Sequence, residues 1–190
     1  MIKALIVALG FAVSSQAVAA PTITDIVVQQ TQQAIMAEAH VQGLDWKVGD
    51  SNNYTIDMGF IKGTMDMSVR SIGAEGIWMD QNMDLGFAGK QKVETLLDPN
   101  TGEVKKMIVN GKEQAPPKNN IEVIDMKEDK ITVPAGSFDC IHVRIKDKDN
   151  NNEINVWVNP QAIPLSGMLK TIQPSQFGNV TVLLKSFKKN

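Results

Sequence analysis

Five methionines are the residues of this sequence whose type and spacing most suggest a chemical role. They alternate with polar residues at period two, the pattern of a half-buried strand, so all five are expected on one apolar face. Methionine is unbranched and carries a polarisable thioether, which suits a surface that adapts to acyl chains of variable shape. With a phenylalanine in the same pattern, the predicted ligand-binding surface consists of Met58, Phe60, Met65, Met67, Met79 and Met83.

Two other interpretations of these methionines stay open. Methionine also fills irregular gaps in ordinary cores, and such packing needs no ligand. Copper(I) prefers soft ligands, and Met65 and Met67 offer two thioethers at strand spacing. Copper is the weaker alternative, because the sequence shows no methionine-rich cluster with a nearby histidine.

Other metal chemistry has only fragments of a motif. Cys140 and His142 would share one face of a strand, but the Cys-x-x-Cys spacing is missing and two ligands do not make a site. Residues with side-chain oxygens also recur at every second position in the run Asp147, Asp149, Asn151 and Glu153. The first residues of a calcium-binding loop have this spacing. Asn152 stands where that loop needs glycine, so a solvated turn explains the run as well. We therefore predict no metal and no cofactor.

Catalytic motifs are missing from the sequence as well. His40 and His142 are its two histidines, and no Gly-x-Ser-x-Gly, phosphate-binding glycine loop or His-Glu-x-x-His is present. Carboxylates fall mostly in turns, where solvation explains them. The sequence therefore predicts a protein that is not an enzyme.

Short strands separated by turn signals must position these side chains. Period-two patterns predict strands over 54–60, 65–69, 77–87, 121–126, 130–133, 138–145, 154–158, 168–172 and 180–187. Tight reversals are expected at 61–63, 98–102, 110–111 and 128–129. Strands joined in this way are antiparallel neighbours, and about ten of them in a small domain should curl.

One amphipathic helix is expected before the strands, from Pro21 to about Gly43. Its apolar stripe includes Ile23, Ile26, Val27, Ala34, Ala37 and Val41. The fold class is therefore mainly β (α+β): a curled antiparallel sheet of about ten strands, an unclosed barrel, wrapped around one N-terminal helix.

The first 19 residues read as a secretory signal peptide, with Lys3, a short apolar stretch and the small residues Ala17 and Ala19 before the expected cut. The mature chain, 20–190, is expected to form a single domain without a membrane span. The net charge of −2 becomes slightly more negative without Lys3, which argues against nucleic acid as a partner. A lone cysteine excludes an internal disulfide.

The stretch Val133-Pro-Ala-Gly-Ser-Phe-Asp-Cys140, followed by Ile141-His-Val143, resembles a strand-turn-strand signature of several uncharacterised periplasmic β-protein families, the PAGxFxC type. The stretches 156–160 and 163–167 fit the same pattern. These families are similar to the LolA and LolB lipoprotein-localisation superfamily. The resemblance implies an unclosed barrel wrapped around helices, with an apolar cavity for acyl chains, and it carries no catalytic residue.

Two functions are expected from these observations. The first is a periplasmic carrier or chaperone that binds a lipid or a lipidated protein in the apolar cavity of the curled sheet. The second is a structural or interaction module with a closed core, whose loops contact another envelope protein. Export beyond the periplasm is compatible with either function.

Overall fold

The structure is a computed structural model, and it describes residues 44–116, 120–175 and 178–190. The expected signal peptide, 1–19, and the expected helix from Pro21 lie outside the described residues. The described part of the chain is mainly β, as predicted, and contains a single antiparallel sheet of 11 strands. A short 3₁₀ turn, η1 (Gly86–Ala88), is the helical element that it includes.

The strands form two meanders along the chain. The first meander comprises β1 (Ser51–Asp57), β2 (Lys62–Gly73), β3 (Gly76–Asp84), β4 (Lys90–Leu97), β5 (Val104–Val109) and β6 (Lys112–Gln114). The second comprises β7 (Ile121–Val133), β8 (Gly136–Asp147), β9 (Glu153–Val158), β10 (Met168–Ser175) and β11 (Gly178–Lys188).

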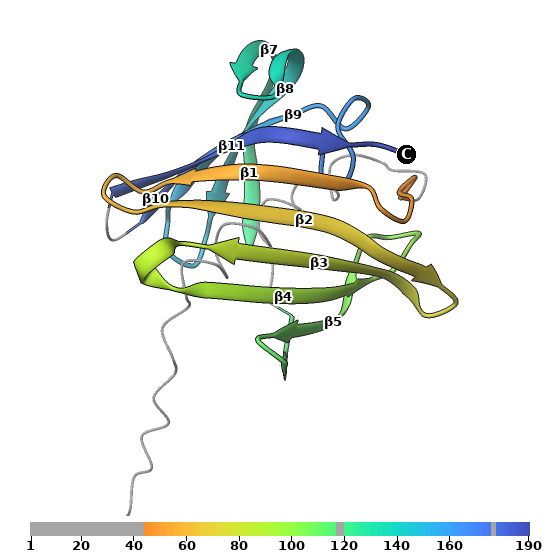
Figure 1. The fold of residues 1–190 in the computed structure, drawn as a ribbon. Helices are drawn as coiled ribbons and strands as arrows, with labels where there is room; N and C mark the ends of the chain where they lie inside the picture. Colours follow the sequence, from red (N-terminus) through yellow and green to blue (C-terminus); the bar gives the residue numbers. More distant parts are fainter. Residues whose placement is uncertain (1–43, 117–119, 176–177) are drawn as a thin grey trace, which may run out of the picture.

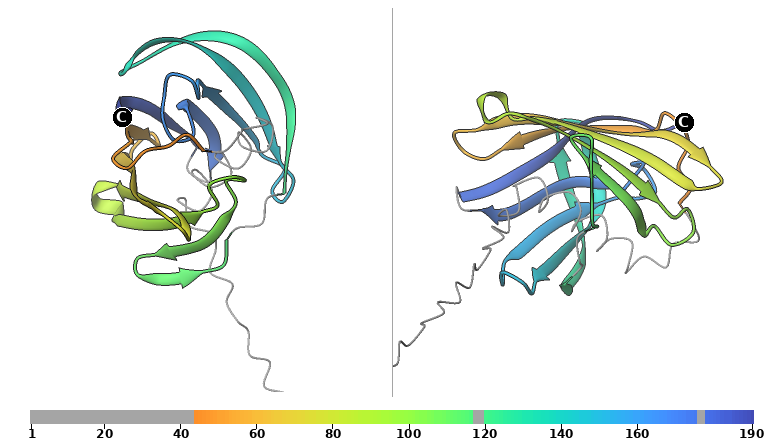
Figure 2. Two further views of the ribbon diagram at one scale, coloured as in Figure 1. Left: turned by 90° about the vertical axis from the view of Figure 1, so that its right-hand side faces the viewer. Right: turned by 90° about the horizontal axis from the view of Figure 1, so that it is seen from below.

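Pairing between β1 and β11 joins the two meanders in the middle of the sheet. The strand order is β6-β5-β4-β3-β2-β1-β11-β10-β9-β8-β7, so β6 and β7 are its two edges (Figure 1). Figure 2 shows the sheet curling into an open arc, with the strands of the second meander crossing those of the first. The expectation of an unclosed, curled antiparallel sheet is confirmed.

The reversals expected at 98–102 and 110–111 are present, and the one expected at 61–63 lies earlier, at 58–61, because Lys62 and Gly63 already pair with β1. The fourth is wrong. Asn110 and Gly111 both have positive φ, 50° and 79°, and connect β5 to β6 as an Asn-Gly pair does in a tight hairpin. The reversal expected at Glu128 and Asp129 does not exist, because both residues pair with β8 inside the continuous strand β7. Acidic residues are common in turns, which is why the sequence suggests a reversal here. In the structure they lie on an edge strand, where charged side chains are also common.

The core lies on the inner face of the curled sheet. Alternate residues of the strands are buried there, as in β1, where Asn52, Tyr54 and Ile56 are 0–4% exposed. The main cluster extends from β1 to β4, where it includes Leu97, and from β7 to β11, and it also includes Trp46 and loop residues such as Ile163.

The β7–β8 hairpin helps to hold the curl. It continues past the end of β9, and its turn reaches β11, where the Ala135 N–H donates to the Leu184 carbonyl oxygen at 3.1 Å. The rings of Phe138 and Phe187 meet edge to face, with centroids 6.3 Å apart. The hairpin therefore contacts β11, a strand that is not its neighbour in the sheet, and this contact holds the curl.

Among the described residues, no helix has the length and apolar content that crossing a bilayer requires.

Candidate functional site

The predicted methionines come together on the inner face of the first meander. Met65 of β2 lies directly opposite Met83 of β3, and opposite Tyr54 of β1 on its other side. Met67 occupies the next inward position of β2, opposite Gln81 of β3, and Met79 lies one inward position beyond Gln81, opposite Val69. Directly opposite side chains stand about 5 Å apart on one face, so Met65 and Met83 are neighbours, whereas Met67 and Met79 share the same face with Gln81 between Met79 and Met83. We call Met58, Met65, Met67, Met79 and Met83 the methionine surface.

Each member of the methionine surface is buried. The exposed fractions are 1% for Met58, 0% for Met65, 1% for Met67, 2% for Met79 and 4% for Met83. Met58 follows β1, and its N–H donates to the Ile61 carbonyl oxygen at 2.9 Å in the β1–β2 turn. A ligand can therefore reach these side chains only after the atoms that now cover them have moved.

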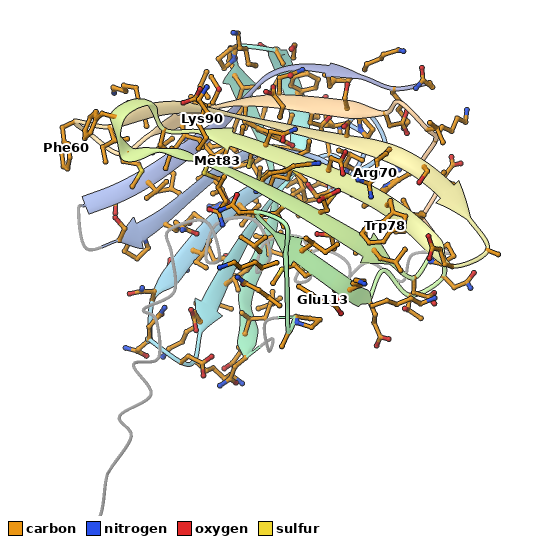
Figure 3. The ribbon with its side chains drawn as sticks, turned by 60° about the horizontal axis from the view of Figure 1, so that its bottom comes forward. Phe60, Arg70, Trp78, Met83, Lys90 and Glu113 are labelled. Carbon is orange, nitrogen blue, oxygen red and sulfur yellow. The ribbon has the colours of Figure 1, made fainter. Side chains whose placement is uncertain are left out.

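Phe60 does not belong to the methionine surface. The sequence places it on the inner face, but the strand ends at Asp57 and Phe60 lies in the β1–β2 turn, where it is 65% exposed. Figure 3 shows it at the end of the molecule, distant from Trp78. Gly59, with φ of 81°, breaks the alternation on which the prediction relied.

Met107 offers an internal comparison. It is 3% exposed on β5 but belongs to a separate small cluster with Val93 and Val109. The main cluster does not include these three residues. A ligand on the methionine surface should therefore leave Met107 unaffected.

Polar side chains interrupt the inner face. Asn52 lies opposite Met67, and Met67 lies opposite Gln81. Gln173 on β10 is also buried, at 2% exposed, and its side-chain oxygen has no hydrogen-bond partner. In the sequence, Gln81 is visible as a break in the alternation of apolar and polar residues. Asn52 lies two residues before Tyr54, so a strand places both on the same face. The inner face is therefore apolar with separate hydrogen-bonding points.

A loop between β9 and β10, residues 159–167, packs against this face. Its ends join through the Asn159 N–H, which donates to the Gly167 carbonyl oxygen at 2.8 Å. Asn52 donates to the Pro164 carbonyl oxygen at 2.9 Å and Tyr54 to that of Met168 at 3.2 Å. Complete burial raises the pKa of the Tyr54 hydroxyl well above its ordinary value, although the hydrogen bond from Asn52 opposes this shift.

Cys140 and His142 share the face of β8 opposite to Val143 and Ile145, and both are buried, with Cys140 in the main core cluster. The His142 ring stacks on Trp157 with centroids 4.2 Å apart, and its Nε2 lies 2.9 Å from Asn155 Oδ1. Burial is the main reason why the pKa of the Cys140 thiol is raised, so this thiol is a poor metal ligand. Within the described residues, no group of three or more His, Cys, Asp or Glu side chains could hold a metal ion.

The calcium-like run forms the β8–β9 turn. The Asp147 carboxylate accepts the Asp149 N–H at 2.9 Å, and Asp149 accepts the side-chain amide of Asn120 at 2.7 Å. Glu153 pairs with Arg144 through two hydrogen bonds of 2.8 and 2.9 Å. These carboxylates bond within the turn and its strands, but Asp147 is only 2% exposed, which the solvated-turn interpretation does not predict.

Two half-open pockets lie away from most of the methionine surface. The larger, about 630 Å³, lies between β7, β8 and the loop after β9, and its lining includes Glu128, Asp129 and Cys140. The smaller, about 390 Å³, lies over the ends of β2 to β4, and Met83 contributes to it. Both linings mix apolar and charged side chains.

Comparison with known proteins gives likenesses in structure only. No protein-family model matches the sequence, and no curated protein matches it. A protein from Bacteroides fragilis described as exported, with a YmcC-like fold, is 11% identical over 77% of this chain and 99% of its own, with a TM-score of 0.43. A hypothetical protein from Chlamydia trachomatis is 12% identical over 84% of this chain and 92% of its own, with a TM-score of 0.48.

MucB, whose structure is also known in complex with periplasmic MucA, is 11% identical over 85% of this chain and 58% of its own, with a TM-score of 0.47. At these identities and TM-scores, the likenesses transfer no function to this chain. The fold itself defines a protein with one unclosed, strongly curled antiparallel sheet.

Proposed function

We propose that this protein is a non-enzymatic periplasmic carrier that holds the acyl chain of a lipid or a lipidated protein against the methionine surface. The observation that carries the proposal is the gathering of five buried methionines, from β2, β3 and the β1–β2 turn, on the inner face of an unclosed sheet. The proposal also includes export by the signal peptide and the LolA-like and LolB-like character that the sequence motif implies.

Methionine side chains make this surface adaptable. Their three rotatable bonds let them rearrange around a flexible chain at low cost, which branched residues cannot do. Each methylene moved out of water gains ~0.8 kcal/mol, so about ten methylenes would gain roughly 8 kcal/mol before the costs of association. Such a gain is large enough to support a carrier.

The open sheet supplies a way to admit the chain. The edge strands β6 and β7 do not pair with each other, so the sheet can widen between them without losing hydrogen bonds of a ladder. A closed barrel would have to break a ladder for the same movement.

Methyl NMR of the methionines tests the carrier directly. Protein labelled with ¹³C at the methionine methyl groups is titrated with methyl laurate, an uncharged lipid, with assignments from single Met→Leu variants. We expect shifts or broadening for members of the methionine surface such as Met65 and Met67, and none for Met107. Unchanged spectra at saturating lipid, together with only apo mass by native mass spectrometry of protein purified from its own envelope, would refute the carrier.

The second candidate is an interaction module with a closed core. The low exposure of the methionine surface favours it, as does the free edge of the 13-residue strand β7, where Ile124 and Met126 are 44% and 48% exposed. An exposed edge can accept an extended segment of another protein.

Photo-crosslinking in cells separates the two functions. A crosslinkable residue replaces Ile124 on β7 or, as a control, Ile72, which is 45% exposed on β2. A discrete adduct from position 124 but not from position 72, together with methionine methyl signals that do not change when lipid is added, would favour the interaction module over the carrier.

A further inference from the structure

Asn52 occupies a buried position at one end of the methionine surface. It is 0% exposed, and it lies directly opposite Met67 on the neighbouring strand. Its side-chain nitrogen donates to the Tyr54 hydroxyl at 3.0 Å and to the Pro164 carbonyl oxygen at 2.9 Å. The amide is therefore held by β1 and by the 159–167 loop together.

The orientation of the Asn52 amide is fixed by these partners. A carbonyl oxygen can only accept a hydrogen bond, so the nitrogen of Asn52 must face Pro164. Tyr54 uses its one hydroxyl proton toward the Met168 carbonyl oxygen at 3.2 Å, so it accepts the proton of Asn52. A flipped amide would place an oxygen against an oxygen at Pro164.

This orientation leaves the Asn52 oxygen as a buried acceptor with no donor. The hydroxyl of Ser166, which is 3% exposed, likewise makes no hydrogen bond of good geometry. It lies close enough to Tyr54 to lower the pKa of that hydroxyl, but burial outweighs this effect. Buried polar atoms are normally paired, so these two point to a group that this part of the chain does not supply.

The charges around Asn52 restrict the chemistry of that group. Asn52, Tyr54 and Ser166 bring no cation to the cluster. The nearest carboxylate along the strand, Asp50, is 1% exposed and accepts the N–H groups of Lys47 and Asn190. Burying a phosphate or carboxylate here would cost free energy without an ion pair to offset it.

We infer that Asn52 and Ser166 form a head-group site of the carrier, which accepts a hydrogen bond from an uncharged polar group, such as a hydroxyl or an amide N–H, attached to an acyl chain on the methionine surface. This inference rests on the proposed function and narrows its ligand class. Lipids with a buried anionic head are disfavoured, because the cluster holds no positive charge.

Three probes whose hydrocarbon chains have about the same length test the inference in the full mature protein. Monolauroylglycerol is uncharged and has hydroxyl donors, methyl laurate is uncharged and has none, and dodecyl phosphate is an anion. By displacement of a fluorescent fatty-acid methyl ester, which is uncharged, we expect monolauroylglycerol to bind about tenfold more tightly than methyl laurate, the value of roughly one buried hydrogen bond. Dodecyl phosphate should bind most weakly.

Asn52→Ala should remove the preference for monolauroylglycerol and keep the affinity for methyl laurate. Asn53→Ala is the matched control, because Asn53 is the next residue of β1 and bonds instead to the exposed Ser186 hydroxyl at 3.2 Å. Should Asn52→Ala fail to fold, two measurements replace it. Ser166→Ala should weaken the preference, and the side-chain amide signals of Asn52 in the unmodified protein should shift with monolauroylglycerol but not with methyl laurate.

The outcomes separate this inference from the carrier function. If none of the probes binds, the carrier itself is refuted. If monolauroylglycerol and methyl laurate bind equally and the Asn52 signals do not move, the carrier stands and the head-group site is overturned. A crystal structure of the lipid complex with an internal water on the Asn52 oxygen would overturn it as well.

Discussion

At the scale of single residues, buried hydrogen bonds join distant parts of this chain. Asp50 shows this most directly, because its two oxygens accept the Lys47 N–H at 2.8 Å and the Asn190 N–H at 2.7 Å. The first residues before β1 and the last residue of the chain are thereby held by one carboxylate that is 1% exposed.

Asp50→Ala should lower the free energy of unfolding by about 2 kcal/mol, because two part-buried N–H groups lose their acceptor and a buried side chain is removed. Urea unfolding followed by circular dichroism measures the change. Asp66→Ala, at an exposed position of β2, is the control and should stay within about 0.5 kcal/mol of the unmodified protein. Equal losses for both variants would contradict the role of Asp50.

Trp157 controls the ionisation of a carboxyl group on the outer side of the sheet. Its indole N–H donates to Asp129 at 2.9 Å, and this bond is the main reason why the pKa of Asp129 is lowered. A lowered pKa means that Asp129 stabilises the fold above the ordinary pKa of aspartate, and that this contribution is lost as the pH falls through the folded value.

Trp157→Phe should therefore raise the pKa of Asp129 back toward the ordinary value, and acid unfolding should lose the contribution of this group. Carboxyl-carbon NMR titration of both proteins measures the shift. Glu153 serves as the internal reference, since its pKa is lowered chiefly by Arg144 and should not follow Trp157. An unmoved Asp129 pKa would show that the indole bond does not form.

At the scale of elements, hairpin geometry depends on particular glycines. Gly76 begins β3 with φ of 142°, and a Cβ at this position would lie 2.2 Å from the Leu97 carbonyl oxygen of β4. Gly73 ends β2 directly opposite Gly76, and a Cβ there would meet nothing within 4 Å.

Gly76→Ala should cost about 2 kcal/mol or more, because it combines a strained φ with a clash against backbone. Gly73→Ala, in the same hairpin, should stay within about 0.5 kcal/mol. Thermal and urea unfolding of the two variants compare the costs, and a Gly76→Ala protein as stable as the Gly73→Ala protein would contradict the close approach of β4.

At the scale of the whole molecule, the β1–β11 pairing divides the sheet into a centre and two edges. Hydrogen exchange should follow this order, with slow exchange in the central strands β1 and β11 and fast exchange in β6, which has three residues, all exposed. Exchange measured by mass spectrometry checks it. Protection of β6 equal to that of β1 would contradict the open edge.

Export is a second prediction at this scale. The chain expressed in a Gram-negative host should appear in the periplasmic extract with its N-terminus near Ala20, as read by intact mass and N-terminal sequencing. Ala19→Arg should block the cut and leave a longer chain. A periplasmic protein that still carries residues 1–19 would disprove the cleavage site.

Much of the architecture could be predicted because it depends on local signals. Period-two alternation predicted that Met65, Met67, Met79 and Met83 share a face, and the register confirms it, because this period is a property of each strand alone. Phe60 was misplaced, since one positive φ at Gly59 ends the strand pattern without any change in hydrophobicity. The role of the methionines as a ligand surface stays a prediction.

By itself, the sequence determined the β class, the antiparallel hairpins and the apolar face, since turn chemistry and alternation act over a few residues. Only the tertiary structure decided that β1 pairs with β11, that β7 is one long edge strand, and that Asn52 meets Pro164 across 112 residues. These contacts depend on loop closure and on the curl of the whole sheet, which no local pattern encodes.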